Sequence, residues 1–247
     1  MEQKFTREDY LLLARLAQQT ERYSEMVEFI SKFVESEGEL SNEERNIVSA
    51  AYKNVVGNKR AELRVLTAIE QKESAKSENI KNYIRSYKNT IENELKKNCS
   101  NIINILDKYL IPNAKSLDSR VFYLKMKGDY NRYLAEFLLD EDYNKALENA
   151  LNSYKDADKI AKMNLAPTNP IRLGLHLNMS VFFYEIMQRQ EDAIKIANQA
   201  FEEAIGNIDN VNQENYKDCT LIMQLLRDNL TLWSNDIQME NERPDDV

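Results

Sequence analysis

Apolar side chains recur every three or four residues along almost the whole 247-residue chain, which is the period of an amphipathic α-helix. Residues that would interrupt such helices are scarce, because the chain contains only 5 glycines and 4 prolines. No stretch alternates convincingly between apolar and polar residues, as a half-buried strand would. A sheet protein also needs many tight turns, and these usually require glycine or proline. The sequence therefore predicts an all-α fold.

Capping residues and breakers divide this pattern into nine predicted helices. Thr6 and Ser41 are suited to cap two of them, because a side-chain hydroxyl can accept a hydrogen bond from the first turn. Pro112 lies just beyond one expected helix, and Pro170 suits the first turn of another. One helix is expected after Thr6 and one from Ser116 or Asp118, and the others over residues 23–34, 41–73, 77–110, 142–165, 170–189, 191–207 and 212–235. The short connections favour antiparallel packing of neighbouring helices.

The chain shows no internal boundary before its C-terminal end. No linker rich in glycine, serine or proline divides it, so a single helical domain is expected over residues 1–235. Residues 236–247 are polar and mainly acidic, and we expect them to form a disordered tail. Residues 146–161 and 193–204 each resemble the second helix of a tetratricopeptide unit, but no repeat of about 34 residues connects them. A helical-repeat scaffold that binds unmodified peptides or tails stays open as an alternative.

The composition argues against several classes of protein. The chain has 33 basic and 41 acidic residues, a net charge of −8, whereas binding to nucleic acid requires an excess of basic residues. No apolar run approaches the ~20 residues of a membrane span, and the N-terminus lacks the order of a secretory signal. Cys99 and Cys219 are too sparse for a disulfide framework or a metal cluster. We therefore expect an intracellular protein with no nucleic-acid partner, no membrane insertion, no cofactor and no metal.

Motifs for catalysis are absent from the sequence. His176 is the only histidine, so neither a histidine-dependent triad nor an HExxH zinc motif can be assembled. The five glycines are scattered and form no phosphate-binding loop. We expect His176 to be a packed or surface residue and the protein not to be an enzyme.

Two pairs of basic residues repeat one spacing. Lys53 and Arg60 are seven residues apart on one predicted helix, and Lys125 and Arg132 repeat this on another, where Tyr133 follows. At about 100° per residue, seven residues return to nearly the same helix face. Each pair alone is typical of a solvated face, whereas two converging pairs would form a site for phosphate, to which a tyrosine hydroxyl adds a donor.

Asp129 and several apolar positions allow two interpretations each. Asp129 lies four residues after Lys125 and three before Arg132, so it could hold both side chains in place or form an ordinary surface ion pair. Apolar residues and asparagines share helix faces elsewhere. Leucines at such spacing are usually core residues, whereas an asparagine is costly to bury without a partner and its amide matches a peptide backbone. These positions are Leu177, Asn178, Val181 and Glu185, and further along Leu221, Leu225, Asn229 and Trp233.

Two long segments resemble the signatures of the 14-3-3 family. Residues 45–57 read RNIVSAAYKNVVG and are similar to the first signature. Residues 216–233 read YKDCTLIMQLLRDNLTLW and are similar to the second. Residues 121–136 and 167–185 also match closely, and the likeness extends over residues 10–233. The chain is therefore identified as resembling a 14-3-3 protein.

The resemblance implies a fold, a function and a set of site residues. It implies nine antiparallel helices that form a cup with a concave amphipathic groove. It also implies a phosphoserine- and phosphothreonine-binding adaptor that regulates phosphorylated client proteins in the cytoplasm and shuttles with them to the nucleus. Carried over position by position, the phosphate would be bound by Lys53, Arg60, Arg132 and Tyr133. The peptide would be contacted by Lys125, Leu177, Asn178, Val181, Glu185, Leu221, Ile222, Leu225, Asn229 and Trp233.

The resemblance further implies a homodimer, or a heterodimer with a paralogue, formed by the N-terminal helices. Arg22 and Glu94 match an ion pair between subunits. Thr90, however, stands where a lysine usually faces Glu25, and Glu62 occupies a position that is often a phosphorylatable serine. We therefore expect a dimer that is weaker than is typical.

Overall fold

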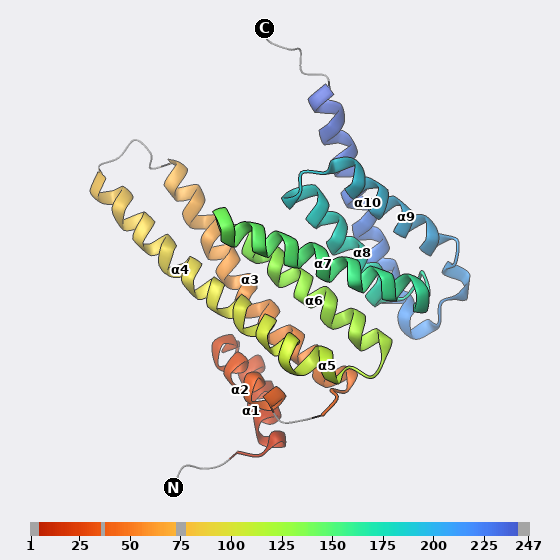
Figure 1. Ribbon diagram of the computed structural model, residues 1–247, viewed down its shortest axis with the longest axis horizontal. Helices are drawn as coiled ribbons and strands as arrows, with labels where there is room; N and C mark the ends of the chain where they lie inside the picture. The colour runs from red at the N-terminus through yellow and green to blue at the C-terminus, as the bar shows by residue number, and fades with distance from the viewer. Residues whose placement is uncertain (1–4, 36–37, 73–77, 242–247) are drawn as a thin grey trace. The chain divides into compact units, whose positions relative to one another are not determined.

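The computed structural model describes residues 5–35, 38–72 and 78–241 (Figure 1). The chain divides into two compact units, unit 1 of Met1–Lys115 and unit 2 of Ser116–Val247. The described residues form nine continuous helical stretches and one short 3-10 turn, and none of these residues is in a strand. The predicted all-α fold is therefore confirmed. The single domain over residues 1–235 and the cup with its groove stay predictions.

Unit 1 is built from helices that pack in chain order. Its elements are α1 (Arg7–Gln19), α2 (Tyr23–Glu35), α3 (Asn42–Lys72), α4 (Glu78–Ile105), the π-helical turn η1 (Leu106–Leu110) and α5 (Ile111–Asn113). Helix α1 packs on α2, α2 on α3, and α3 on α4. Both predicted caps are confirmed, because Thr6 Oγ1 accepts from the Asp9 N–H at 3.2 Å and Ser41 Oγ accepts from the Glu44 N–H at 3.2 Å. The predicted helix ends at Glu73 and Ser77 lie outside the described residues.

The fourth helical stretch does not end near Leu110, as predicted, but continues to Asn113. The π-helical turn η1 separates α4 from α5. Pro112 consequently lies inside a continuous helical stretch, in the first turn of α5, and it offers no N–H to the carbonyls of the turn before it. Proline is therefore not a stop signal at this position.

Unit 2 is built around α6, a helix most of whose residues are buried. Its elements are α6 (Leu117–Ala135), α7 (Asp140–Asn164), α8 (Pro170–Val181), the π-helical turn η2 (Phe182–Ile186), α9 (Gln190–Ile205), the 3-10 turn η3 (Ile208–Asn210) and α10 (Gln213–Asn241). Helices α6 and α7 lie side by side along much of their length (Figure 1). Helix α8 packs against α6, α7, α9 and α10, and therefore connects the unit.

Alanines form the buried faces of two helices in unit 2. Small side chains allow neighbouring helices to approach closely, which explains why both stretches resembled a tetratricopeptide unit without a repeat. The buried alanines are Ala146, Ala150, Ala157 and Ala161 on α7, and Ala193, Ala197, Ala200 and Ala204 on α9.

Helix α10 extends beyond the predicted boundary at Asn235. It ends at Asn241, so the first six residues of the expected tail, 236–241, are helical rather than disordered. Tyr184 Oη donates a hydrogen bond to Asp236 Oδ2 at 3.0 Å, which ties this part of α10 to η2. The remaining residues of the expected tail, 242–247, lie outside the described part of the chain.

Candidate functional site

Helix α6 carries charged side chains into the interior of unit 2. Asp129 and Arg132 are each only 6% exposed, although charged groups are seldom buried unless they are paired. The helix has buried residues on several faces because α7 and α8 both pack against it. Its central turns therefore bring ionised groups into a region from which water is largely excluded.

Asp129 is the centre of a hydrogen-bonded cluster that joins three helices. Its Oδ2 accepts a charge-assisted bond from Lys125 Nζ at 2.8 Å on the same helix. Its Oδ1 accepts from Tyr154 Oη of α7 at 2.6 Å and from Asn178 Nδ2 of α8 at 2.8 Å. Both carboxylate oxygens are thus used, and the carboxylate fixes side chains that come from α6, α7 and α8.

Arg132 extends this cluster along α6. Its Nε donates to Tyr154 Oη at 3.4 Å, and its Nη1 lies 3.6 Å from Glu136 Oε1. Its guanidinium carbon lies 4.6 Å from the centre of the Tyr133 ring, within the range of a cation–π contact. The guanidinium is therefore held by an aromatic face and by oxygens on two helices.

The ionisation of the cluster follows from burial and from the charges within it. Burial by itself would raise the pKa of Asp129, but Lys125 and then Arg132 outweigh it and lower that pKa. Burial raises the pKa of Tyr154, and the neighbouring Asp129 raises it further, so its hydroxyl keeps its proton. Burial opposes the charge on Arg132, whereas Tyr154, Tyr133 and Asp129 raise its pKa. Near neutral pH, Asp129 is therefore an anion between two cations.

The prediction that Asp129 holds its neighbours in place is confirmed for Lys125, and the alternative of a surface ion pair is wrong because Asp129 is buried. The structure also brings Asn178 into the same cluster. Tyr154 was missed by the sequence analysis. Its position in the alanine face of α7, between Ala150 and Ala157, was the available signal, because a large polar ring among alanines requires space and a partner.

The predicted peptide-binding residues of α8 and α10 differ in exposure. Leu221 and Leu225 of α10 are 60% and 44% exposed, so the interpretation of these leucines as core residues is wrong. Leucines that are exposed together on one helix are typical of an interaction surface. The half-buried members of the set are Leu177, Asn178, Val181, Ile222 and Asn229, and Glu185 is exposed.

Trp233 stands apart from the other predicted peptide-binding residues. It is only 4% exposed, and its ring stacks on Tyr184 with 4.6 Å between the ring centres. The indole therefore packs inside unit 2, between α10 and η2, and its predicted role beside the peptide stays a prediction.

Two of the four predicted phosphate ligands, Lys53 and Arg60, belong to unit 1. Lys53 is exposed and Arg60 is half-buried, and both lie on α3 with the predicted separation of seven residues. Arg132 and Tyr133 belong to unit 2. That all four residues bind one phosphate stays a prediction.

Comparisons with known proteins identify the family. The family model described as 14-3-3 protein matches residues 13–234. The chain is 54% identical to 14-3-3-like protein C of Nicotiana tabacum, over 98% of this chain and 96% of the relative. It is 52% identical to 14-3-3-like protein GF14 phi of Arabidopsis thaliana, over 98% of this chain and 91% of the relative. The chain belongs to the 14-3-3 family.

This membership confirms the function expected from the resemblance. Proteins of the 14-3-3 family are phosphoserine- and phosphothreonine-binding adaptors, not enzymes, and a helical-repeat scaffold is not better supported. Dimers and a cytoplasmic location are typical of the family. Among the described residues, no helix combines the length and the apolar character needed to cross a bilayer. No cluster of three or more histidine, cysteine, aspartate or glutamate side chains in the described part of the chain could hold a metal ion.

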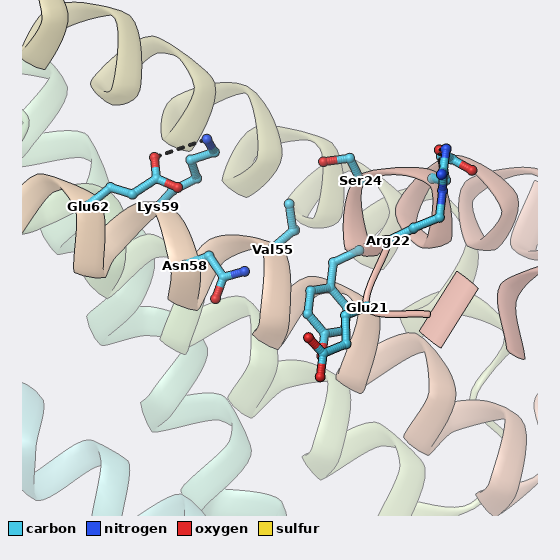
Figure 2. A pocket seen from close by; sticks show the side chains of 9 residues that line it. Glu21, Arg22, Ser24, Val55, Asn58, Lys59 and Glu62 are labelled. Carbon is cyan, nitrogen blue, oxygen red and sulfur yellow. Dashed lines mark hydrogen bonds and ion pairs between the residues drawn. The ribbon is translucent and has the colours of Figure 1, made fainter. Parts of the chain in front are cut away.

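Three of the residues that the 14-3-3 resemblance assigns to the dimer interface, Arg22, Glu25 and Glu62, line a pocket of unit 1. The pocket has a volume of about 320 Å³ and is lined by residues of α2, α3 and the turn before α2 (Figure 2). Lys59 Nζ lies 3.0 Å from Glu62 Oε2 and 2.7 Å from Glu94 Oε2. Arg22 Nε donates to Glu25 Oε1 at 2.7 Å.

These ion pairs differ from those implied by the resemblance. Within the chain, Arg22 pairs with Glu25 and Glu94 pairs with Lys59, whereas the resemblance joins Arg22 and Glu94 between subunits. Lys59 was missed by the sequence analysis, although its spacing of three residues from Glu62 on one helix was a signal for an ion pair. Thr90 Oγ1 donates to the Ser86 carbonyl at 3.1 Å, as exposed helical threonines commonly do.

Proposed function

We propose that this chain binds phosphorylated serine and threonine segments through Lys53, Arg60, Arg132 and Tyr133. Two arginines and a lysine supply the charge that attracts a phosphate, and the tyrosine supplies a neutral donor. The phosphate carries about −1.5 to −2 charges near neutral pH, so an unmodified client lacks most of the attraction. The chain then acts as an adaptor that clamps phosphorylated clients without chemical change.

The buried Asp129 cluster is the observation that supports this proposal. It holds Lys125 and Asn178 in fixed positions and connects to Arg132 through Tyr154. Side chains held in this way lose little conformational entropy when a ligand binds, and this raises affinity. A bond from an ionised group contributes about 1.5–3 kcal/mol, so loss of one arginine should weaken binding roughly tenfold to a hundredfold.

The flanking peptide is proposed to lie along α8 and α10. Asn178 and Asn229 carry amides that can both donate to and accept from a peptide backbone. The exposed leucines Leu221 and Leu225 offer apolar surface to the side chains of the client. Lys125, Leu177, Val181, Glu185, Ile222 and Trp233 complete the proposed peptide-binding set.

A titration with matched peptide libraries tests the proposal. A fluorescent serine peptide library with randomised flanks is prepared in phosphorylated and unphosphorylated forms, and anisotropy is measured with the full chain. We expect binding of the phosphorylated library only, and a loss of at least tenfold in Lys53→Gln and Arg60→Gln. Lys145→Gln removes an exposed lysine outside the proposed set and serves as the control. Equal affinity for both libraries would instead favour a scaffold that binds unmodified peptides.

The chain is further proposed to dimerise, with itself or with a paralogue, in the cytoplasm and to accompany clients to the nucleus. The proposed interface contains Arg22, Glu25, Glu62, Thr90 and Glu94, and exposed ion pairs of this kind contribute only about 0–1 kcal/mol each. Two linked sites would bind a doubly phosphorylated client with higher avidity. Sedimentation velocity should show monomers at nanomolar concentration, and a species that stays dimeric there would contradict a weakened interface.

A further inference from the structure

We propose that Tyr154 is a positioning residue for phosphopeptide binding and that Gly128 provides the space in which its ring must lie. The proposal rests on the proposed function, because it concerns how Arg132 and Lys125 are held for a ligand. Tyr154 would not touch the ligand. It would act through Asp129 and Arg132, which its hydroxyl group links.

The hydroxyl of Tyr154 donates one hydrogen bond and accepts another. It donates its proton to Asp129 Oδ1 at 2.6 Å and accepts from Arg132 Nε at 3.4 Å. A phenol has one proton to donate and lone pairs that accept, so a single oxygen can join a carboxylate to a guanidinium. Tyr154 is fully buried, so solvent water does not compete for these hydrogen bonds. Arg132 is therefore linked to Asp129 through this oxygen, alongside its contacts with Glu136 and the Tyr133 ring.

Asp129 transmits the position of Tyr154 to two further predicted ligand contacts. Asn178 Nδ2 and Tyr154 Oη share Asp129 Oδ1, while Lys125 Nζ bonds Oδ2. Removal of the phenol hydroxyl leaves Asp129 with one donor fewer in a buried place, where an unmet acceptor is costly. The carboxylate then keeps only its bonds from Lys125 and Asn178, and these three side chains shift together.

The backbone of α6 determines where the Tyr154 ring can lie. A Cβ atom on Gly128 would lie 2.7 Å from Tyr154 Cε1, much closer than carbon atoms approach. On another side the ring packs against Phe182, with 5.4 Å between the ring centres. The ring is thus confined between α6 and η2, and glycine at position 128 is needed for close approach rather than for backbone freedom. Gly128→Ala would displace the ring and its hydroxyl together.

Two substitutions separate the hydroxyl from the ring. Tyr154→Phe keeps the ring and removes the oxygen, whereas Gly128→Ala keeps the oxygen and displaces it. Tyr52→Phe in unit 1 is the matched control, since Tyr52 is also fully buried and its hydroxyl bonds Ser31 and Asn101, each at 3.1 Å. Tyr154→Phe and Tyr52→Phe each remove one buried hydroxyl, so these two variants should lose comparable folding stability.

The phosphorylated and unphosphorylated peptide libraries are titrated against each full-length variant, and the Arg132 Nε–H resonance is followed by ¹⁵N NMR. We expect Tyr154→Phe and Gly128→Ala to weaken binding of the phosphorylated library about tenfold, with a shifted Nε–H resonance, and Tyr52→Phe to change binding less than twofold. If Tyr154→Phe does not fold, Gly128→Ala decides the question by the same measurements. A merely structural role would lower stability without changing affinity, and unchanged affinity in the folded variants would overturn this inference alone. Equal binding of both libraries by the unmodified chain would overturn the proposed function and this inference with it.

Discussion

In unit 2 the side chains of Asp129 and Arg132 are 9% and 7% exposed, whereas those of Lys59 and Glu94 in unit 1 are 24% and 49% exposed. The contact distances are similar, with 2.8 Å between Lys125 and Asp129 and 2.7 Å between Lys59 and Glu94. The length of the ion pairs therefore does not distinguish the cluster in unit 2 from the pairs in unit 1. Burial does, because charges attract more strongly and are more costly to leave unpaired where water is excluded.

The difference indicates what each region is suited to. A buried cluster keeps one arrangement, because every alternative leaves an ion without a partner. Exposed pairs exchange water and partners at little cost. The Asp129 cluster is thus suited to holding ligand-binding groups in position. The pairs of Lys59 and Arg22 are suited to a surface that another subunit can rearrange.

The largest expected effect comes from breaking the buried cluster. Asp129→Ala removes the buried carboxylate that accepts bonds from Lys125, Tyr154 and Asn178 and that balances the charge of Arg132, and we expect it to lower the free energy of unfolding by about 3–5 kcal/mol. Glu62→Ala, which removes an exposed carboxylate, is the control. Urea denaturation measures both, and equal losses would show that burial is not what distinguishes the two regions.

A second prediction tests whether burial acts in the same way in unit 1. Burial raises the pKa of Tyr52 to about 12. The hydrogen bonds with Ser31 and Asn101 lower this pKa, but burial outweighs them. The folded state keeps this proton at a pH where the unfolded chain has lost it, so stability falls as pH rises from about 10 to about 12, by up to about 2.7 kcal/mol. Stability below pH 10 is unaffected by this titration.

Tyr52→Phe should remove this part of the alkaline loss. Urea denaturation of the variant and the unmodified chain between pH 9 and pH 12 measures the difference. Tyr83→Phe, at a residue that is 76% exposed, controls for the loss of a phenol. Parallel curves for Tyr52→Phe and the unmodified chain would contradict the prediction.

A smaller effect is expected from Lys59. Glu94 first and then Glu62 raise the pKa of Lys59 against partial burial, but both carboxylates remain in contact with water. Lys59→Met should therefore cost no more than about 1 kcal/mol, and the loss should shrink in high salt. The measurement is urea denaturation at low and high salt, at a concentration where sedimentation shows the same oligomeric state for both proteins. A loss of unfolding free energy as large as that of Asp129→Ala would show that the ion pairs of Lys59 behave like those of the buried cluster.

The smallest effect is expected from Arg22. The ion pair between Arg22 and Glu25 is exposed and joins residues only three apart in the sequence. Arg22→Gln should therefore leave the urea midpoint unchanged within error. Self-association measured by sedimentation should weaken, because the same charge is proposed to lie at the subunit interface. A lowered midpoint without weaker association would reverse this assignment.

Much of the fold could be read from local patterns. The caps at Thr6 and Ser41 depend on residues within one turn, and both are confirmed. The π-helical turn before Pro112 was not predicted, because such turns are rare and the proline was interpreted as the end of the helix. The continuation of α10 past Asn235 brings Asp236 to Tyr184, a contact between residues far apart in the sequence that no local pattern indicates.

The candidate site shows the same division. Lys125, Asp129 and Asn178 were recognised as polar residues on helical faces, and the structure brings them together. Tyr154 was not recognised, because its role arises from contacts with α6 that no spacing on α7 records. Leu225 and Trp233 share one periodic stripe, yet the leucine is exposed and the tryptophan is buried.

The sequence by itself determined the helical class, the helix starts at Thr6, Ser41, Ser116 and Pro170, and the family, because helical period, capping and long signatures are properties of neighbouring residues. Only the tertiary structure decided which charges are buried and which remain in water. That choice depends on which helices pack together, and it sets the strength of every ion pair through the exclusion of water.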